Sequence, residues 1–237
     1  MRKHLLPGIQ FCTWQDALKR LAGSFAVLLF LALQAASSAS ADSPAVPAGA
    51  TGEGLGVGLA VLVVLVAAFM YAIVVIVLAA FGRVVPAGPG WITFAVPALC
   101  AVGLGVAAYL TFVEVRHVAA ICGPIGDCNT VQSSPYARLF GLLPIGLLGL
   151  LGYLAILFFW AIEQFSKSRF SDLAAVAVFA FALFGVLFSI YLTYLELTVI
   201  RAVCMWCLTS AVIMAILLVL TTGTAVARLV PVVETDS

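Results

Sequence analysis

Apolar residues in this chain gather in five long stretches that carry almost no charge, and most polar residues lie between the stretches. The hydrocarbon core of a bilayer is about 30 Å thick and needs about 20 apolar residues of helix to cross it. Apolar and polar residues do not alternate within the stretches as they do in membrane barrel strands, and a helix satisfies its own backbone hydrogen bonds in lipid. The pattern predicts five membrane-spanning helices, over residues 55–81, 91–113, 139–162, 173–195 and 207–226.

The first 41 residues follow a different pattern. Basic residues precede a short apolar run at 21–33, and small residues follow, ending in Ala39-Ser40-Ala41. This order is typical of a secretory signal peptide, with an uncleaved signal anchor as the alternative. The next residues are rich in Pro, Gly, Ala and Ser, which predicts a flexible linker. We therefore expect a leader (1–41), a linker (42–54), an extra transmembrane helix (55–82) and a four-helix bundle (91–226).

Both kinds of leader give the same orientation, with residues 1–20 in the cytoplasm and the loops 116–138 and 198–206 outside. Eight Lys and Arg residues then lie inside and three outside, in agreement with the positive-inside rule. The inside set is Arg2, Lys3, Lys19, Arg20, Arg83, Lys167, Arg169 and Arg228, and the outside set is Arg116, Arg138 and Arg201. We expect a multi-pass protein of the cell (inner) membrane whose two loops face the periplasm or the exterior.

The composition agrees with a membrane protein and argues against a soluble globular protein and a nucleic-acid-binding protein. Of the 237 residues, 65% are hydrophobic and 9% are charged, with a mean hydropathy of +1.24, whereas soluble domains are about 25% charged. Such a chain lacks the polar residues that would cover a soluble globule. The 11 basic and 10 acidic residues balance, so we expect no nucleic-acid partner.

Four of the six cysteines fall on the predicted outer side, where disulfides form and persist. Cys204 and Cys207 make a C-x-x-C at the start of the last span, where the unpaired N–H groups of a helix favour a thiolate. Cys122 and Cys128 flank a turn-rich loop segment whose freedom suits thiol–disulfide exchange. Three interpretations remain open: static disulfides that staple the loops, four ligands of a zinc ion, or a relay that passes electrons between the pairs.

The two cysteine regions are related by an internal repeat with an offset of 82 residues. Residues 109–115, Y-L-T-F-V-E-V, match residues 191–197, Y-L-T-Y-L-E-L, and Cys122 then falls on Cys204. The repeat predicts two parallel helical hairpins that form a four-helix bundle, with both cysteine segments at its outer mouth. It also makes Glu114 and Glu196 equivalent. For these carboxylates we expect structural ion pairs with partners such as Arg116, Arg138 or Arg201.

Residues 122–153, C-G-P-I-G-D-C-N-T-V-Q-S-S-P-Y-A-R-L-F-G-L-L-P-I-G-L-L-G-L-L-G-Y, resemble the core of bacterial vitamin K epoxide reductase homologues. The later Y-L-T-Y-L-E-L and C-M-W-C agree, so the resemblance covers about residues 91–222. The DsbB family performs similar chemistry in a four-helix bundle but carries its C-x-x-C in the first loop. Here the C-x-x-C comes last, which favours the vitamin K epoxide reductase order.

The resemblance implies a role for each cysteine and for one serine. Cys207 would face a quinone co-substrate (menaquinone or ubiquinone), Cys204 would exchange with Cys128, and Cys122 would react with a redox partner. Ser134 matches the serine that hydrogen-bonds a quinone carbonyl oxygen in the family, although a turn or cap before Pro135 would also explain a serine there. No metal is expected. Candidate walls of the quinone pocket are Trp206, Phe140 and Tyr136.

Many bacterial members carry a fused thioredoxin-like domain after the bundle, whereas this chain ends about eleven residues past the last span. The resemblance then implies a separate partner with a thioredoxin fold, of DsbA type. The expected function is a membrane thiol:quinone oxidoreductase that supports disulfide formation outside the cytoplasm. The alternatives are a non-enzymatic membrane scaffold with structural loop disulfides and a cysteine-based metal-binding or transport protein.

Overall fold

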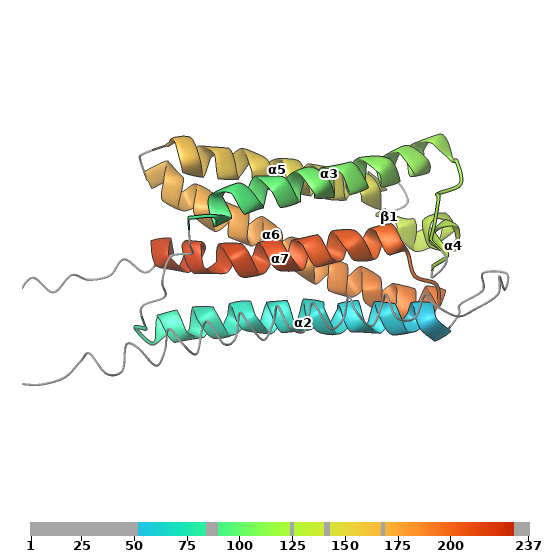
Figure 1. Ribbon diagram of the computed structural model, residues 1–237, viewed down its shortest axis with the longest axis horizontal. Helices are drawn as coiled ribbons and strands as arrows, with labels where there is room; N and C mark the ends of the chain where they lie inside the picture. The colour runs from blue at the N-terminus through green and yellow to red at the C-terminus, as the bar shows by residue number, and fades with distance from the viewer. Residues whose placement is uncertain (1–51, 84–89, 124–125, 140–142, 167–168, 230–237) are drawn as a thin grey trace, which may run out of the picture.

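The computed structural model describes residues 52–83, 90–123, 126–139, 143–166 and 169–229, so the expected leader and most of the linker lie outside the described residues. Five helices are long and apolar enough to cross a membrane. They are α2 (Gly52–Ala80), α3 (Ile92–Arg116), α5 (Ile145–Phe165), α6 (Arg169–Leu195) and α7 (Met205–Leu229) (Figure 1). The prediction of an all-α membrane protein with five spans is confirmed.

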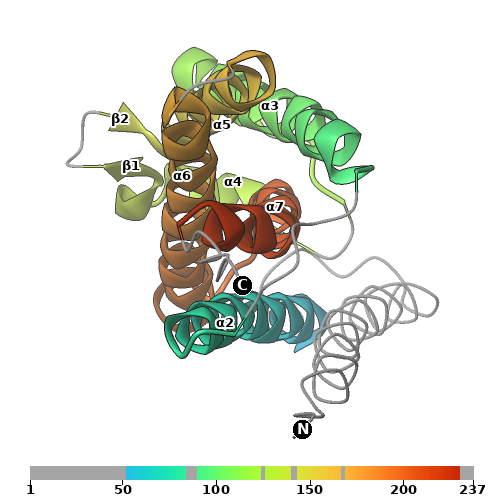
Figure 2. The same ribbon diagram turned by 90° about the vertical axis from the view of Figure 1, so that its left-hand side faces the viewer.

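The long helices form a bundle with one additional helix at its edge. α3 packs against α5 and α6 against α7, so both predicted hairpins form; α5 then packs on α6 and α3 on α7. α2 lies beside α6 and α7 and leaves α3 and α5 on the far side of the bundle (Figures 1 and 2). The extra span therefore packs along one side of the four-helix bundle.

α7 is the most enclosed of the five helices, with Leu217, Leu218 and Thr222 fully buried. Small residues on its neighbours let the backbones approach, as is usual between membrane helices. A Cβ on Gly185 of α6 would lie 2.8 Å from Sδ of Met214 in α7. The core of the bundle thus lies around α7.

The short elements gather at one end of the bundle, next to the start of α7 (Figure 1). They are α4 (Cys128–Ser133), the 3-10 helix η1 (Pro135–Ala137), the two-residue strands β1 (Arg138–Leu139) and β2 (Leu143–Pro144), and the π-helical turn η2 (Glu196–Ile200). β1 and β2 pair in antiparallel fashion, Arg138 opposite Pro144. The third span therefore begins at Ile145 rather than at residue 139, because Arg138–Leu139 pair with Leu143–Pro144 as strands and Pro144, which has no N–H group, stands directly before the helix.

Both helices that lead toward the cysteine segments end on a residue with left-handed backbone conformation. His117 has φ 51° after α3, and Arg201 has φ 56° after η2. These positions are 84 residues apart, although the sequence repeat has an offset of 82. The π-helical turn carries the second helix about two residues further, so Cys204 follows its helix end more closely than Cys122 follows Arg116.

Candidate active site

The loop cysteines are joined: Cys122 and Cys128 form a disulfide. Asp127 caps α4 by accepting a hydrogen bond from the backbone N–H of Thr130 at 3.1 Å. The Asn129 side chain accepts from the backbone N–H of Ala120 at 2.7 Å and so ties α4 to the irregular segment that follows α3. Cys128 is fully buried under this loop, whereas Cys122 is half-buried at its surface.

The disulfide loop packs directly on the C-x-x-C segment. The backbone N–H of Asp127 donates to the carbonyl of Val203 at 3.1 Å. A Cβ on Gly126 would lie 2.6 Å from that same carbonyl oxygen, so this close approach requires glycine. As a result Cys128 and Cys204, both 0% exposed, belong to one buried cluster. The structure thereby brings the two predicted pairs together.

Trp206 joins the same two segments. Its indole N–H donates to the carbonyl of Ile121 at 3.0 Å, and its ring lies 4.8 Å from that of Tyr109, whose hydroxyl oxygen accepts from the N–H of Ile121. Trp206, a candidate pocket wall, directs its polar N–H to the loop and does not line the cavity described below. Phe140, another predicted wall, lies outside the described residues.

Cys204 and Cys207 are free thiols at the start of α7. The backbone N–H of Cys207 donates to Sγ of Cys204 at 3.3 Å. The Cys207 thiol also donates to this sulfur, which lowers the pKa of Cys204; burial opposes the effect, and the backbone N–H groups of Cys207 and Trp206 add to it. A thiol with a lowered pKa at a helix N-terminus suits thiol–disulfide chemistry.

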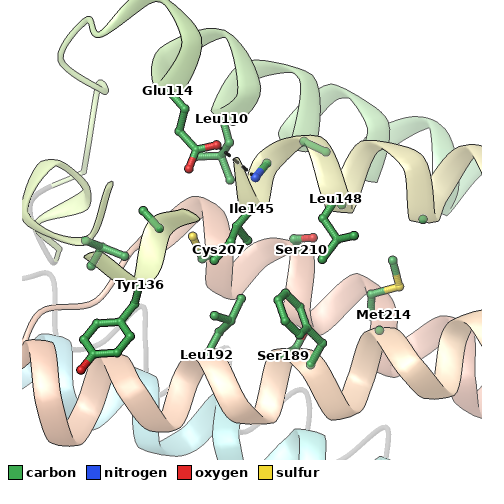
Figure 3. Close-up of a pocket in the computed structure, with 18 of the residues that line it drawn as sticks. Leu110, Glu114, Tyr136, Ile145, Leu148, Ser189, Leu192, Cys207, Ser210 and Met214 are labelled. Carbon is green, nitrogen blue, oxygen red and sulfur yellow. Dashed lines mark hydrogen bonds between the residues drawn. The ribbon is translucent and has the colours of Figure 1, made fainter. Parts of the chain in front are cut away.

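A cavity of about 370 Å³ lies beside Cys207, between α5, α6 and α7, and reaches the η1 turn and α3 (Figure 3). Its end near the loop carries the polar side chains of Glu114, Gln132, Ser134, Tyr136, Glu196 and Cys207. The remaining wall is mainly apolar and includes Leu148, Leu151, Phe181, Phe184, Phe188 and Met214. The cavity therefore has a polar end and an apolar end, and Cys207 lies at the polar one.

Ser134 lies in the cavity wall, and its hydroxyl donates to the carbonyl of Val131 at 2.7 Å. Both sequence interpretations thus describe part of its surroundings, because the residue closes a turn after α4 and also borders the cavity. The hydroxyl can donate to a bound molecule only by turning away from Val131. Its role as a substrate ligand stays a prediction.

Glu114 and Glu196 are 7% and 3% exposed, and both line the cavity. The Glu114 carboxylate accepts from the N–H of Gly146 at 3.1 Å, and that of Glu196 from the N–H of Cys204 at 3.3 Å. Among the described residues neither forms a salt bridge, so the expected close ion pairs with Arg116, Arg138 or Arg201 are not found, although Arg138 interacts with Glu114 electrostatically. The carboxylates point inward, while these three arginines are exposed at the surface. Sequence reasoning therefore missed two cavity residues, although a carboxylate in an apolar span is itself a sign of function.

Within the described part of the chain, no group of three or more His, Cys, Asp or Glu side chains is placed to hold a metal ion. Among protein families, the model of the Vitamin K epoxide reductase family matches residues 94–222, from early in α3 to late in α7. This match includes Cys122, Cys128, Cys204 and Cys207, together with Ser134 and both cavity glutamates, and it leaves out α2. The chain belongs to the vitamin K epoxide reductase family.

Proposed function

We propose that this membrane thiol oxidoreductase reoxidises a separate thioredoxin-fold protein of DsbA type and passes the electrons to a membrane quinone. The observation that carries the proposal is the position of Cys207. This thiol borders the polar end of a cavity, and its C-x-x-C partner Cys204 lies in one buried cluster with the loop disulfide. An electron donor at the surface and an acceptor in the cavity would thus be served by adjoining cysteine pairs.

The shape and lining of the cavity support a quinone as the acceptor. Leu151 of α5 and Phe181 and Phe184 of α6 line it and are each more than a third exposed, so we place its opening to lipid between α5 and α6. A molecule with a polar head and an apolar tail, such as menaquinone or ubiquinone, would enter from lipid and place its head near Cys207 and Ser134. Such sites combine a mostly apolar wall with a few polar groups that orient the ligand.

The proposed relay balances electrons and protons. The partner dithiol attacks the Cys122–Cys128 disulfide, leaves as a disulfide and reduces the loop pair. Cys128 then exchanges with Cys204, so that the loop disulfide re-forms and the C-x-x-C becomes a dithiol. That dithiol gives two electrons and two protons to the quinone, forms the Cys204–Cys207 disulfide and yields the quinol. A loop disulfide beside two free thiols, the arrangement described above, corresponds to the state before the last step.

We also propose that the site faces the periplasm or the cell exterior. The described basic residues divide evenly, with Arg116, Arg138 and Arg201 near the cysteine end and Arg83, Arg169 and Arg228 near the other. The orientation therefore depends on the basic residues of 1–20 and on Lys167, which lie outside the described residues. Labelling of reduced Cys122 in whole cells by an impermeant thiol reagent would support it, and labelling only after the cells are opened would contradict it.

The decisive test is quinone reduction by the purified chain with a reduced DsbA-type protein as electron donor. Cys207→Ala should abolish turnover, because the last electron donor is lost. Cys100→Ala is the matched control, since Cys100 is a free buried cysteine of α3 that does not line the cavity, and it should retain wild-type turnover. Equal turnover in Cys207→Ala would overturn the mechanism. No quinone reduction by the wild type would favour a scaffold whose loop disulfide is structural.

A further inference from the structure

Glu196 is hydrogen-bonded directly to the C-x-x-C segment. It opens the π-helical turn at the end of α6, and its backbone carbonyl accepts from the N–H of Ala202 at 3.2 Å, across six residues. Its carboxylate accepts from the N–H of Cys204 and also interacts with the Cys207 thiol. Single π-turns inside helices often occur at functional sites. This one places a buried carboxylate against both members of the dithiol.

Among the residues that the structure describes, no cation competes for this carboxylate. Among the described residues, the titratable groups that interact with Glu196 are the thiols of Cys204 and Cys207, and Glu114 interacts with the same thiols from α3. Glu196 and Cys207 both line the cavity in which we place the quinone. A proton held on Glu196 would therefore have the dithiol on one side and the substrate on the other.

We propose that Glu196 accepts the thiol protons of Cys207 and Cys204 in turn and delivers them to the two oxygens of the bound quinone. The inference rests on the proposed function and names a further catalytic residue for it. Two thiol protons leave as the Cys204–Cys207 disulfide forms, two electrons pass to the quinone, and its two oxygens each gain one proton. The carboxylate is regenerated after each transfer, so the step needs no other oxidant or reductant.

Charge conservation explains why a carboxylate serves at this position. A thiolate that formed by losing its proton to bulk water would add a new charge to a mainly apolar site, and isolated buried charges are costly. When Glu196 takes the proton, the negative charge only moves from oxygen to sulfur and the net charge of the site stays constant. The exchange requires a neighbouring base rather than a hydrogen-bond acceptor alone.

The test compares Glu196→Gln with the wild type in quinone reduction. Glutamine keeps an oxygen that can accept from the N–H of Cys204 but cannot take up a proton. We expect turnover at pH 6 to fall about 100-fold, within the range contributed by a positioned general base, and the deficit to shrink toward pH 9 as solvent removes the proton instead. Glu196→Asp should recover part of the rate. Glu163→Gln, a carboxylate near the opposite end of α5, should leave turnover unchanged.

Equal turnover of Glu196→Gln and the wild type at pH 6 would overturn the inference. A deficit of the same size at pH 6 and pH 9 would also overturn it, because it would mean that Glu196 only holds the fold of the C-x-x-C. If the glutamine variant does not fold, Glu196→Asp provides the test instead. Aspartate is a base with a shorter reach, so its turnover should be lower than that of the wild type and should depend on pH as predicted for glutamine.

A readout without quinone separates this inference from the proposed function. In a Cys204→Ser background Cys207 is the remaining thiol of the C-x-x-C, and its alkylation by N-ethylmaleimide can be followed by mass spectrometry. An ionised Glu196 disfavours a second negative charge on the Cys207 sulfur, so at pH 8 alkylation should be about tenfold slower with Glu196 than with glutamine, and the two rates should converge at low pH, where Glu196 is protonated. If this difference is found but the wild type reduces no quinone, the proposed function fails, whereas the assignment of Glu196 as the proton acceptor is supported. If quinone is reduced but alkylation does not depend on residue 196, the inference alone fails.

Discussion

The two cysteine pairs lie on equivalent helical hairpins, but the chain between the helices differs greatly in length. Residues 117–144 connect α3 to α5, whereas only residues 201–204 connect η2 to α7. The long connection has room for a disulfide loop, a short helix and a hairpin, and it leaves Cys122 half-exposed. The short connection fixes Cys204 and Cys207 at the start of α7, with Cys204 buried and Cys207 against the cavity. The two hairpins are alike, but the difference in loop length places one cysteine pair at the surface and the other against the cavity.

Breaking the link between the two halves should have the largest effect. We expect Cys128→Ser to lower quinone reduction driven by a DsbA-type protein at least about 1,000-fold, because a thiol–disulfide relay that loses its bridging sulfur has no alternative route. Turnover driven by a small dithiol that reduces the C-x-x-C directly should persist. Unchanged protein-driven turnover would show that electrons enter at Cys204 or Cys207 without the loop.

The polar end of the cavity can be probed at Ser134. We expect Ser134→Ala to reduce kcat/KM for quinone about tenfold, since a hydrogen bond to a group that gains charge contributes about 1.5–3 kcal/mol. The reaction of the partner protein with Cys122 should keep its rate. Ser133→Ala is the matched control, because the Ser133 hydroxyl donates to Thr130 and the residue is outside the cavity. Equal losses in the two variants would limit Ser134 to a structural role.

A smaller loss of electron-transfer rate is expected when the packing of the disulfide loop on the C-x-x-C is disturbed. In Gly126→Ala the new Cβ meets the carbonyl of Val203, so we expect electron transfer from the loop pair to the C-x-x-C to slow about fivefold, the equivalent of one hydrogen bond of about 1 kcal/mol. Gly123→Ala provides the control, because a Cβ there has no neighbour within 4 Å. Stopped-flow measurement of Cys204–Cys207 reduction tests this, and equal rates in both variants would mean that the Asp127–Val203 contact does not align the pairs.

The smallest effect is expected at the opposite end of the second hairpin. Arg228 and Asp172 form an ion pair at 2.7 Å, but their side chains are 44% and 50% exposed. Exposed pairs contribute about 0–1 kcal/mol, so Asp172→Asn should shift the thermal unfolding midpoint by about 2 °C or less and leave quinone reduction unchanged. A marked loss of turnover would show that the two ends of the bundle are coupled.

The features predicted from the sequence are those that depend on residues close together in the chain. Hydrophobic runs set the five spans, and the repeat places both cysteine pairs and both glutamates at one end of the bundle. The features it missed depend on contacts between distant segments. The Trp206 indole donates to Ile121, 85 residues away, and the two carboxylates accept hydrogen bonds from the backbone N–H groups of Gly146 and Cys204. The pairing of the loop cysteines was likewise left open, because spacing alone allows several connectivities.

The hairpin before α5 and the π-helical turn after α6 escaped prediction for a related reason. Hydropathy continues across both places, so a window of apolar residues extends the helix through residues 139–144 and gives no sign of an extra-wide turn at Glu196. Only the backbone coordinates show where α-helical hydrogen bonding begins before α5 and where it widens to a π turn after α6. The π-helical turn contributes Glu196 to the cavity wall, and the hairpin ends directly before Ile145, the first residue of α5 in that wall.

For the quinone proposed as acceptor, the proposed opening between α5 and α6 determines which concentration governs the reaction. A substrate that enters there never leaves the hydrocarbon phase, so the quantity that saturates the enzyme is the mole fraction of quinone in the membrane rather than its amount per litre. In proteoliposomes, adding quinone-free lipid that fuses with the vesicles should slow turnover, whereas diluting the same vesicles with buffer should not. Kinetic constants for this protein would then depend on how much membrane the cell makes as well as on how much quinone.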